Sequence, residues 1–283
     1  MSPGREAFVG FDSAWAGKAP GGIASATFSQ DRLVHTRLPE PAGFDHAAAI
    51  IEELKSTHHY VLVAIDQPTI VPNQTGSRPV DRVAASLVSR LRGGVQPANQ
   101  GKTKSGRTMP SKVRMFGPEA PIWQFLRRID AVQNPPQSRS AASGRHAIEV
   151  FPALALPALE PAILERKRAA RYNPANRRRF SLSDWRLVAR AASRHAAALR
   201  LTALSEWAHD LAEIPKPTKT DQDCLDAAIC LIVALHWRRA PRNQATVIGD
   251  AQSGYMVSPV TPATRAILQS AATKRGVPMD MPW

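Results

Sequence analysis

Cysteine, aromatic residues and acidic residues are all scarce in this chain of 283 residues. Its two cysteines, Cys224 and Cys230, lie in one apolar run, where we interpret them as buried thiols rather than a disulfide or a zinc site. No apolar stretch reaches the roughly 20 residues that a membrane span requires, and residues 1–8 lack the apolar core of a signal peptide. We therefore expect a cytoplasmic protein with no membrane partner.

Basic residues outnumber acidic ones, with 37 Lys and Arg against 23 Asp and Glu and a formal net charge of +14. An excess of this size favours a polyanionic partner, most simply nucleic acid, either DNA or RNA. The alternative is a soluble protein whose proteome is rich in arginine. Composition does not decide between them.

Two apolar runs each end in a single aspartate. Residues 8–11 lead into Asp12, and a turn rich in Gly and Pro follows. Residues 61–65 lead into Asp66, and Pro68 then stops the strand. An uncompensated acid so close to a core strand is costly, so each one either caps a turn or belongs to a charged site that something else neutralises. The recurrence favours the charged site.

Apolar periodicity predicts an α/β fold. Strands are expected at 8–12, 22–28, 33–38, 61–66 and 147–151, with a crossover helix at 44–54. Three antiparallel strands, a helix and a fourth, near-continuous apolar strand indicate a mixed sheet with helix cover. We expect a single domain, 1–283, with an insertion at about 67–146, because 80 residues exceed an ordinary connection.

Within the insertion, helices are predicted at 80–91 and 120–129, separated by a basic loop at 93–114. Further on, the sequence predicts short helical pieces at 152–164, a long helix at 182–211 and a buried helix at 221–237. A hairpin at 247–257 and a proline-containing tail complete the chain. Basic residues that we expect to contact nucleic acid are Arg78, Arg82, Lys102, Lys104, Arg107, Lys112, Arg114 and Arg171.

The predicted buried helix begins with two acids, Asp223 and Asp226, which share one helical face. Asp223 alternatively caps the helix in a box with Thr220, whereas Asp226 lies too far in to cap. Glu149, in the strand at 147–151, is a fifth candidate, although alternation could equally point it to solvent. Clustered carboxylates repel unless divalent cations neutralise them, and Mg²⁺ or Mn²⁺ prefers such oxygen ligands.

Six segments in this order and spacing resemble the predicted-nuclease family DUF429 of the ribonuclease H-like superfamily. They are GFDSAWAG, AIDQP, RPVDR, IEVFPALAL, DCLDAAIC and GDAQSGYMVSP. The resemblance covers nearly the whole chain and implies a mixed five-stranded sheet in the order 32145, helices on both faces and acids gathered at one end. Its D-x-x-D-A motif is similar to the one that carries the final acid pair of RuvC-type resolvases. The resemblance would make Asp223 and Asp226 that acid pair. The basic insertion has no counterpart in a minimal ribonuclease H domain.

The resemblance implies hydrolysis of phosphodiester bonds assisted by two Mg²⁺ ions. Asp12 would bridge the ions, Asp66 and Asp226 would each hold one, and Asp223 or Glu149 would complete a shell. Trp15 or Trp123 could stack on a base, although either is more often a core residue. The strongest rival is a non-catalytic nucleic-acid-binding or scaffold protein on the same fold. No phosphate-binding glycine loop and no nucleophile elbow supports a nucleotide hydrolase or a serine or cysteine hydrolase.

Overall fold

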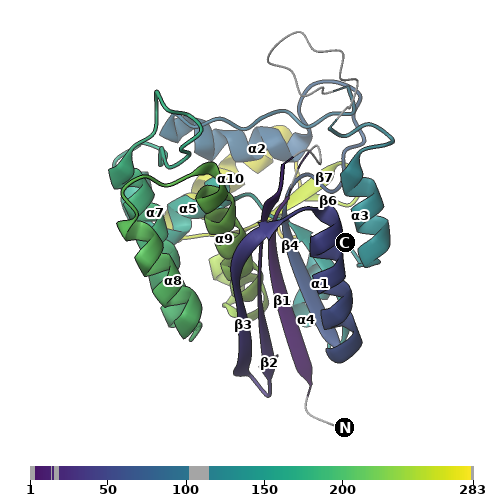
Figure 1. Cartoon of the computed structure of the whole chain (residues 1–283). Coiled ribbons are helices and arrows are strands. Elements are labelled where there is room, and N and C mark those ends of the chain that lie inside the picture. Colours follow the sequence, from purple (N-terminus) through teal and green to yellow (C-terminus); the bar gives the residue numbers. More distant parts are fainter. Residues whose placement is uncertain (1–3, 14, 16–18, 102–114, 282–283) are drawn as a thin grey trace.

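Five strands form a mixed sheet in the order β3-β2-β1-β4-β5 in the computed structural model, which describes residues 4–13, 15, 19–101 and 115–281 (Figure 1). β1 pairs antiparallel with β2 and parallel with β4, β3 pairs antiparallel with β2, and β5 pairs parallel with β4. This confirms the predicted α/β class and strand order. The strands are β1 (Arg5–Asp12), β2 (Gly21–Ser29), β3 (Arg32–Ala42), β4 (Tyr60–Asp66) and β5 (Gly144–Glu149).

Helices cover both faces of this sheet (Figure 1). Because side chains alternate along a strand, Phe8 and Leu62 face the core under α9 (Lys219–Arg239), while Val9 and Val63 face α1 (Phe44–Thr57) and α3 (Pro121–Ile129). Burying each such side chain contributes about 1.5–3 kcal/mol. The alternation therefore fixes which side chains at the strand ends share a face with α9.

Glycines let α9 lie directly against the sheet. A Cβ on Gly10 would be 2.2 Å from the Ala227 carbonyl oxygen and from the Leu231 nitrogen. A Cβ on Gly22 would be 2.4 Å from the carbonyl oxygen of Asp223. The first turns of α9 are thus held over the carboxyl end of β1 and the adjoining start of β2.

The elements of the insertion pack on both sides of the sheet. They are α2 (Pro79–Val88), the 3-10 turn η1 (Ser89–Leu91), α3 and α4 (Pro135–Ser140). α3 packs on α1 on one face, α4 packs on α9 and β5 on the other, and α2 packs on α10 (Pro262–Arg275). Five residues of the predicted basic loop lie outside the described residues: Lys102, Lys104, Arg107, Lys112 and Arg114.

Two helix predictions are wrong. The segment 182–211 forms two helices, α7 (Leu182–Ala198) and α8 (Thr202–Glu213), because Arg200 between them takes a left-handed conformation with φ of 62°. The predicted tail contains α10, whose start is capped by the Thr261 side chain accepting from the Thr264 amide.

The predicted short helical pieces and the hairpin are confirmed. The remaining elements are α5 (Pro152–Leu159), α6 (Pro161–Glu165), the 3-10 turn η2 (Arg242–Gln244), β6 (Ala245–Asp250) and β7 (Gly254–Pro259). Cys224 and Cys230 are free and buried, as predicted. In the part of the chain that the structure describes, no helix has both the length and the apolar character needed to cross a bilayer.

Candidate active site

Asp12 and Asp66 are register partners at the carboxyl ends of β1 and β4. Adjacent strands lie about 4.7–4.9 Å apart, so the two backbones hold these acids side by side. Alternation places Asp12 on the same face as Phe8, and Asp66 on the same face as Leu62, which is the face that α9 covers. The fold therefore directs both acids toward the start of α9.

Asp226 reaches this face from the second turn of α9 and is 4% exposed. Its Oδ1 accepts a 2.7 Å hydrogen bond from the Tyr172 hydroxyl, and its Oδ2 accepts one from Gln222. These two donors fix the orientation of the carboxylate.

Asp223 forms an ion pair with Lys219, one turn earlier on α9. The prediction that it caps the helix with Thr220 is wrong, because the capping box is made by Thr218 and Asp221. Asp223 is 8% exposed, and its charge lies close enough to raise the pKa of Asp12.

Burial and the repulsion of neighbouring carboxylates raise the pKa of Asp12, Asp66 and Asp226. Desolvation is the largest cause of the raised pKa of Asp12 and Asp66, and the negative charge of Asp226 raises both further. Desolvation also raises the pKa of Asp226, to about 6, although the hydrogen bonds from Tyr172 and Gln222 oppose it. Among the described residues, Asp12 and Asp66 have no ion-pair partner of their own.

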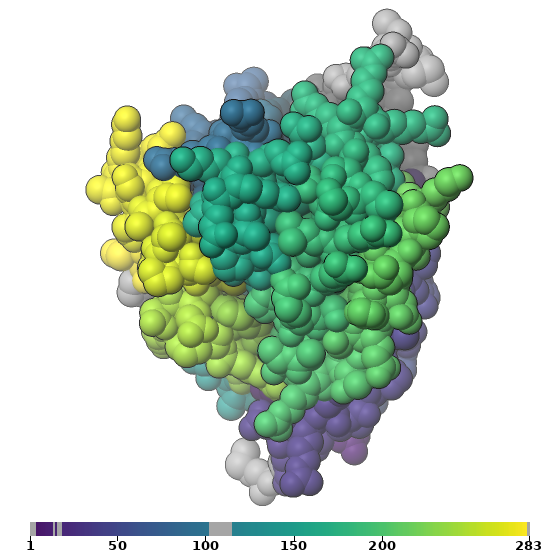
Figure 2. Space-filling model, turned by 90° about the vertical axis from the view of Figure 1, so that its left-hand side faces the viewer, coloured from purple at the N-terminus to yellow at the C-terminus, as the bar shows by residue number. Residues whose placement is uncertain are grey.

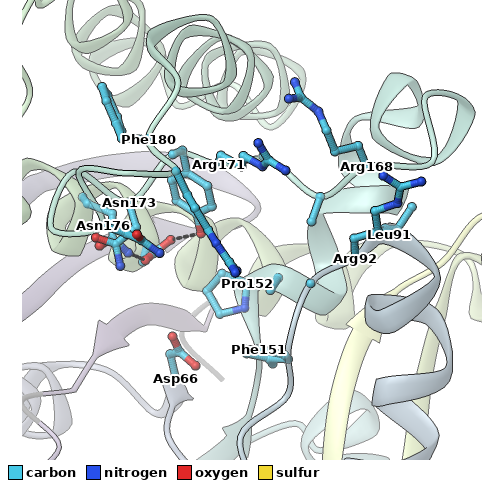
Figure 3. A pocket seen from close by; sticks show the side chains of 18 residues that line it. Asp66, Leu91, Arg92, Phe151, Pro152, Arg168, Arg171, Asn173, Asn176 and Phe180 are labelled. Atoms are coloured by element: carbon cyan, nitrogen blue, oxygen red, sulfur yellow. Dashed lines mark hydrogen bonds between the residues drawn. The ribbon is translucent and has the colours of Figure 1, made fainter. Parts of the chain in front are cut away.

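A cavity of about 330 Å³ opens beside these acids (Figure 3). Asp66 and Asp226 contribute carboxylates to its lining, and Arg92, Arg168 and Arg171 contribute guanidinium groups. In Figure 3, Asp66 lies with Phe151 at the base of the cavity, with the three arginines on its far side. The segment 166–181, which supplies most of that wall, stands at the upper edge of the face formed by α7 and α8 (Figure 2).

A profile of the family described as "protein of unknown function (DUF429)" matches residues 10–252. The chain belongs to the DUF429 family. The match includes Asp12, Asp66, Glu149, Asp223 and Asp226. No curated protein and no solved structure matches the chain.

Glu149 of this DUF429 chain is not grouped with the other acids. It pairs in register with Ile65, whose side chain lies on the opposite face of the sheet from Asp66. Its carboxylate accepts hydrogen bonds of 2.9 and 2.6 Å from Arg78 and one of 2.9 Å from the Thr69 amide. The alternative that Glu149 points to solvent is thus wrong, and the cationic Arg78 already compensates the charge that a metal ion would otherwise neutralise.

The prediction that Arg78 contacts nucleic acid is also wrong. Its side chain is fully buried, where it pairs with Asp81 and Glu149 and donates to the Ile70 carbonyl. Burial opposes its charge, yet Glu149 and Asp81 together raise the pKa of the guanidinium above its ordinary value. Arg78 therefore ties the insertion to β5 instead of facing a ligand.

Arg82 and Arg171 of this DUF429 chain are exposed, as a nucleic-acid contact requires, but only Arg171 lines the cavity beside the acids. Arg82 lies in a separate hollow beside α10. Trp15 is half-buried and packs edge-on against Phe116, while the Trp123 indole donates to the Gly117 carbonyl.

Several site residues escaped the sequence reasoning. Gln222 and Lys219 each lie four positions before an acid of α9, a spacing that places them on the same helical face and could have identified them. Ser13 and Gln67 follow Asp12 and Asp66 directly, and their side chains hydrogen-bond to each other across the strand ends. Tyr172 lies in an irregular segment, where no periodicity signals a contact with α9.

A hard divalent cation suits this donor set chemically, since buried carboxylates that repel one another and lack cationic partners are the ligands that Mg²⁺ or Mn²⁺ prefers. In the structure, however, these side chains are not arranged to bind such an ion. Within residues 4–13, 15, 19–101 and 115–281, no group of three or more His, Cys, Asp or Glu side chains is placed to hold a metal ion. Binding would require the carboxylates of Asp12 and Asp66 to move toward Asp226, whose orientation Tyr172 and Gln222 fix.

Proposed function

We propose that this protein is a metal-dependent nuclease that hydrolyses phosphodiester bonds of DNA or RNA. The observation that supports it is the in-register pair Asp12 and Asp66 on the α9 face, next to Asp226 and beside a cavity lined by arginines. Acids that lack cationic partners attract metal ions, and arginines attract phosphates. As part of the same proposal we place the protein in the cytoplasm, which suits its free buried cysteines.

Asp12, Asp66 and Asp226 would hold Mg²⁺ or Mn²⁺ in this proposal, with Asp223 contributing if it leaves Lys219. When bound, the metal supplies a water of lowered pKa and neutralises charge on the phosphate. Tyr172 and Gln222 orient Asp226, so that one ligand is fixed before substrate arrives. Arg171 and its neighbours in the cavity hold the phosphates of the substrate in place.

A second candidate is a nucleic-acid-binding protein without catalysis. The lack of a ready group of three metal ligands among the described residues favours it. It keeps the arginine-lined cavity as a binding surface and assigns the acids no chemical role.

Cleavage assays separate the two candidates. Labelled single-stranded and duplex DNA and RNA are incubated with wild type and with Asp12→Asn, Asp66→Asn and Asp226→Asn, in Mg²⁺, in Mn²⁺ and in EDTA. The nuclease proposal expects cleavage only with metal and a loss of about 10²-fold or more in each variant. The matched control is Asp221→Asn, a helix-capping acid of α9, which should keep activity wherever it remains folded. Binding of nucleic acid without metal-dependent cleavage would instead support the second candidate.

A further inference from the structure

Two cavities meet at Asp66. The first, which we call the arginine cavity, is the 330 Å³ cavity described above. The second, about 340 Å³, is lined in part by Trp15, Val95, Met115 and Met256, and we call it the tryptophan cavity. Asp66 and Phe151 line both cavities, so the candidate metal ligand lies at their boundary. A ligand that occupied both would pass directly over it.

The arginine cavity has cationic groups that no protein carboxylate neutralises. In the described part of the chain, Arg92, Arg171 and Arg179 line this cavity without an ion pair, whereas Arg168 is paired with Asp184. Arg92 follows η1 and Arg171 belongs to the segment 166–181, so distant parts of the sequence converge here (Figure 3). Unpaired guanidinium groups around a cavity fit phosphate oxygens, which they bind in a bidentate manner.

The tryptophan cavity differs in chemistry. Trp15 lines it from one side and is held edge-on by Phe116, with ring centroids 6.0 Å apart. Val95 and Met115 add partly exposed apolar surface. The acids Asp81 and Glu149, which also line it, are both paired with Arg78. An aromatic ring with apolar neighbours suits the flat face of a nucleobase, on which it can stack without regard to sequence.

We propose that the site takes single-stranded nucleic acid, laid across Asp66 with one nucleotide in each cavity. This inference rests on the proposed function, because it supplies the substrate of that site. Each cavity is at the lower end of the range of about 300–1,000 Å³ found for small-ligand pockets, which suits one nucleotide and is too small to enclose a duplex. A base inside a duplex would have to leave its stack before it could enter. The substrate phosphate over Asp66 is then flanked by phosphates near the arginines and by a base near Trp15.

Binding measured in EDTA tests this without relying on catalysis. The probe is a short fluorescein-labelled oligothymidine, compared with the same strand annealed to oligodeoxyadenosine. Wild type should bind the strand about tenfold or more tightly than the duplex. Arg92→Ala and Arg171→Ala should each weaken strand binding about tenfold, and Trp15→Ala should weaken it by about the same factor. Trp15→Phe should retain most of the affinity because it keeps a stacking ring.

Arg177→Ala and Arg178→Ala provide the matched control. Both arginines are exposed in the same segment, 166–181, but line neither cavity, so these variants should leave the preference for strand over duplex unchanged. Melting curves identify any variant that has lost its fold. The affinities for strand and duplex are then compared only among the variants that remain folded. Equal affinity for strand and duplex in wild type would overturn the inference, as would an equal loss of the strand preference in the cavity and control variants.

The two proposals fail separately. A preference for single strands that depends on the cavities, without metal-dependent cleavage, would support this inference and refute the nuclease. Metal-dependent cleavage with no preference for single strands would support the nuclease and refute this inference.

Discussion

The Glu149 carboxylate receives two hydrogen bonds from Arg78 and one from the Thr69 amide, whereas Asp66 has no ion-pair partner among the described residues. Both acids lie at the ends of neighbouring parallel strands, and burial raises the pKa of both. The difference is that Arg78 compensates the charge of Glu149, while Asp226 adds repulsion at Asp66. Glu149 is therefore one partner of a compensated buried ion pair, whereas the charge of Asp66 is held at a cost in stability.

Matched amide substitutions should separate these two roles. Glu149→Gln removes one partner of a buried ion pair and should lower the free energy of unfolding by about 3–5 kcal/mol. Asp66→Asn removes a repelled charge and should leave the metal-free protein equally stable or more stable. Urea denaturation in EDTA measures both. A loss at Asp66→Asn comparable to that at Glu149→Gln would show that Asp66 is an ordinary structural acid.

His236, on α9 and remote from the acids, predicts how stability depends on pH. Burial, with the nearby charges of His195 and Arg139, lowers its pKa from 6.5 to about 4. Its folded pKa is depressed, so the unfolded chain binds the proton first. The stability it contributes is present above pH 6.5 and is lost as pH falls toward about 4.

Replacing His236 with leucine should remove this part of the acid sensitivity, which is on the order of 2–3 kcal/mol across that window. The free energy of unfolding is measured for wild type and His236→Leu as pH is lowered. The control is His35→Leu, whose ring is exposed on β3. If wild type and His236→Leu lose stability in parallel, the ring is not a buried neutral group.

At the scale of elements, short apolar runs were enough to predict where the strands lie. The runs ending at Asp12 and Asp66 have one apolar face for each core, whereas the strand order 32145 was implied by the resemblance to DUF429 and not by the apolar pattern. Glu149 was misassigned because its register partner is Ile65, a shift of one residue that reverses the face. Such a shift depends on how strands that are distant in the sequence pair with each other. Local periodicity carries no information about that register.

Helix boundaries were less predictable because they depend on single residues. The capping threonine is Thr218, while Thr220 fits the same sequence pattern two positions later. The break between α7 and α8 occurs at Arg200, which takes a left-handed conformation that the sequence does not favour for arginine. Packing of α7 against α8, which holds that turn, is a tertiary effect.

The contact between α9 and β1 gives a prediction about how the acids are held. Gly10→Ala would place a methyl group 2.2 Å from backbone atoms of α9, so the helix must shift away from the sheet. Overpacking of this kind costs about 1–3 kcal/mol or more, and it should also displace Asp226 from Asp12. The melting temperature of the variant, and any increase in it on adding metal, should both be lower than in wild type.

Gly43→Ala is the matched substitution, because a Cβ there meets nothing within 4 Å. It should change melting temperature and metal response much less than Gly10→Ala does. If the two variants behave alike, close approach of α9 does not position the acids.

At the scale of the whole molecule, the cavities could not be predicted from sequence. Arg92, Arg171 and Trp15 come from three distant segments that only the complete fold brings to Asp66. Likewise, charge counting did not distinguish a buried arginine from a free one. Arg78 lies inside the core, and Arg168 is paired with Asp184, although both contribute to the formal charge.

The net charge of +14 should still govern binding to any polyanion. Contacts with phosphates release counterions, so affinity falls steeply with salt, by about 10³–10⁵ between roughly 50 and 200 mM for a protein that contacts about 6–10 phosphates. Duplex DNA, which suits neither cavity, should show this fall as clearly as a single strand. The Arg177→Ala/Arg178→Ala double variant should reduce the slope of log affinity against log salt on both duplex and single strand, by up to about 0.9 per arginine on duplex, so that the preference for strand over duplex stays unchanged. Fluorescence anisotropy over a salt series measures the slope, with a methylphosphonate oligonucleotide of the same sequence as the uncharged control. A flat slope on duplex would mean that phosphate neutralisation is not what attracts nucleic acid to this surface.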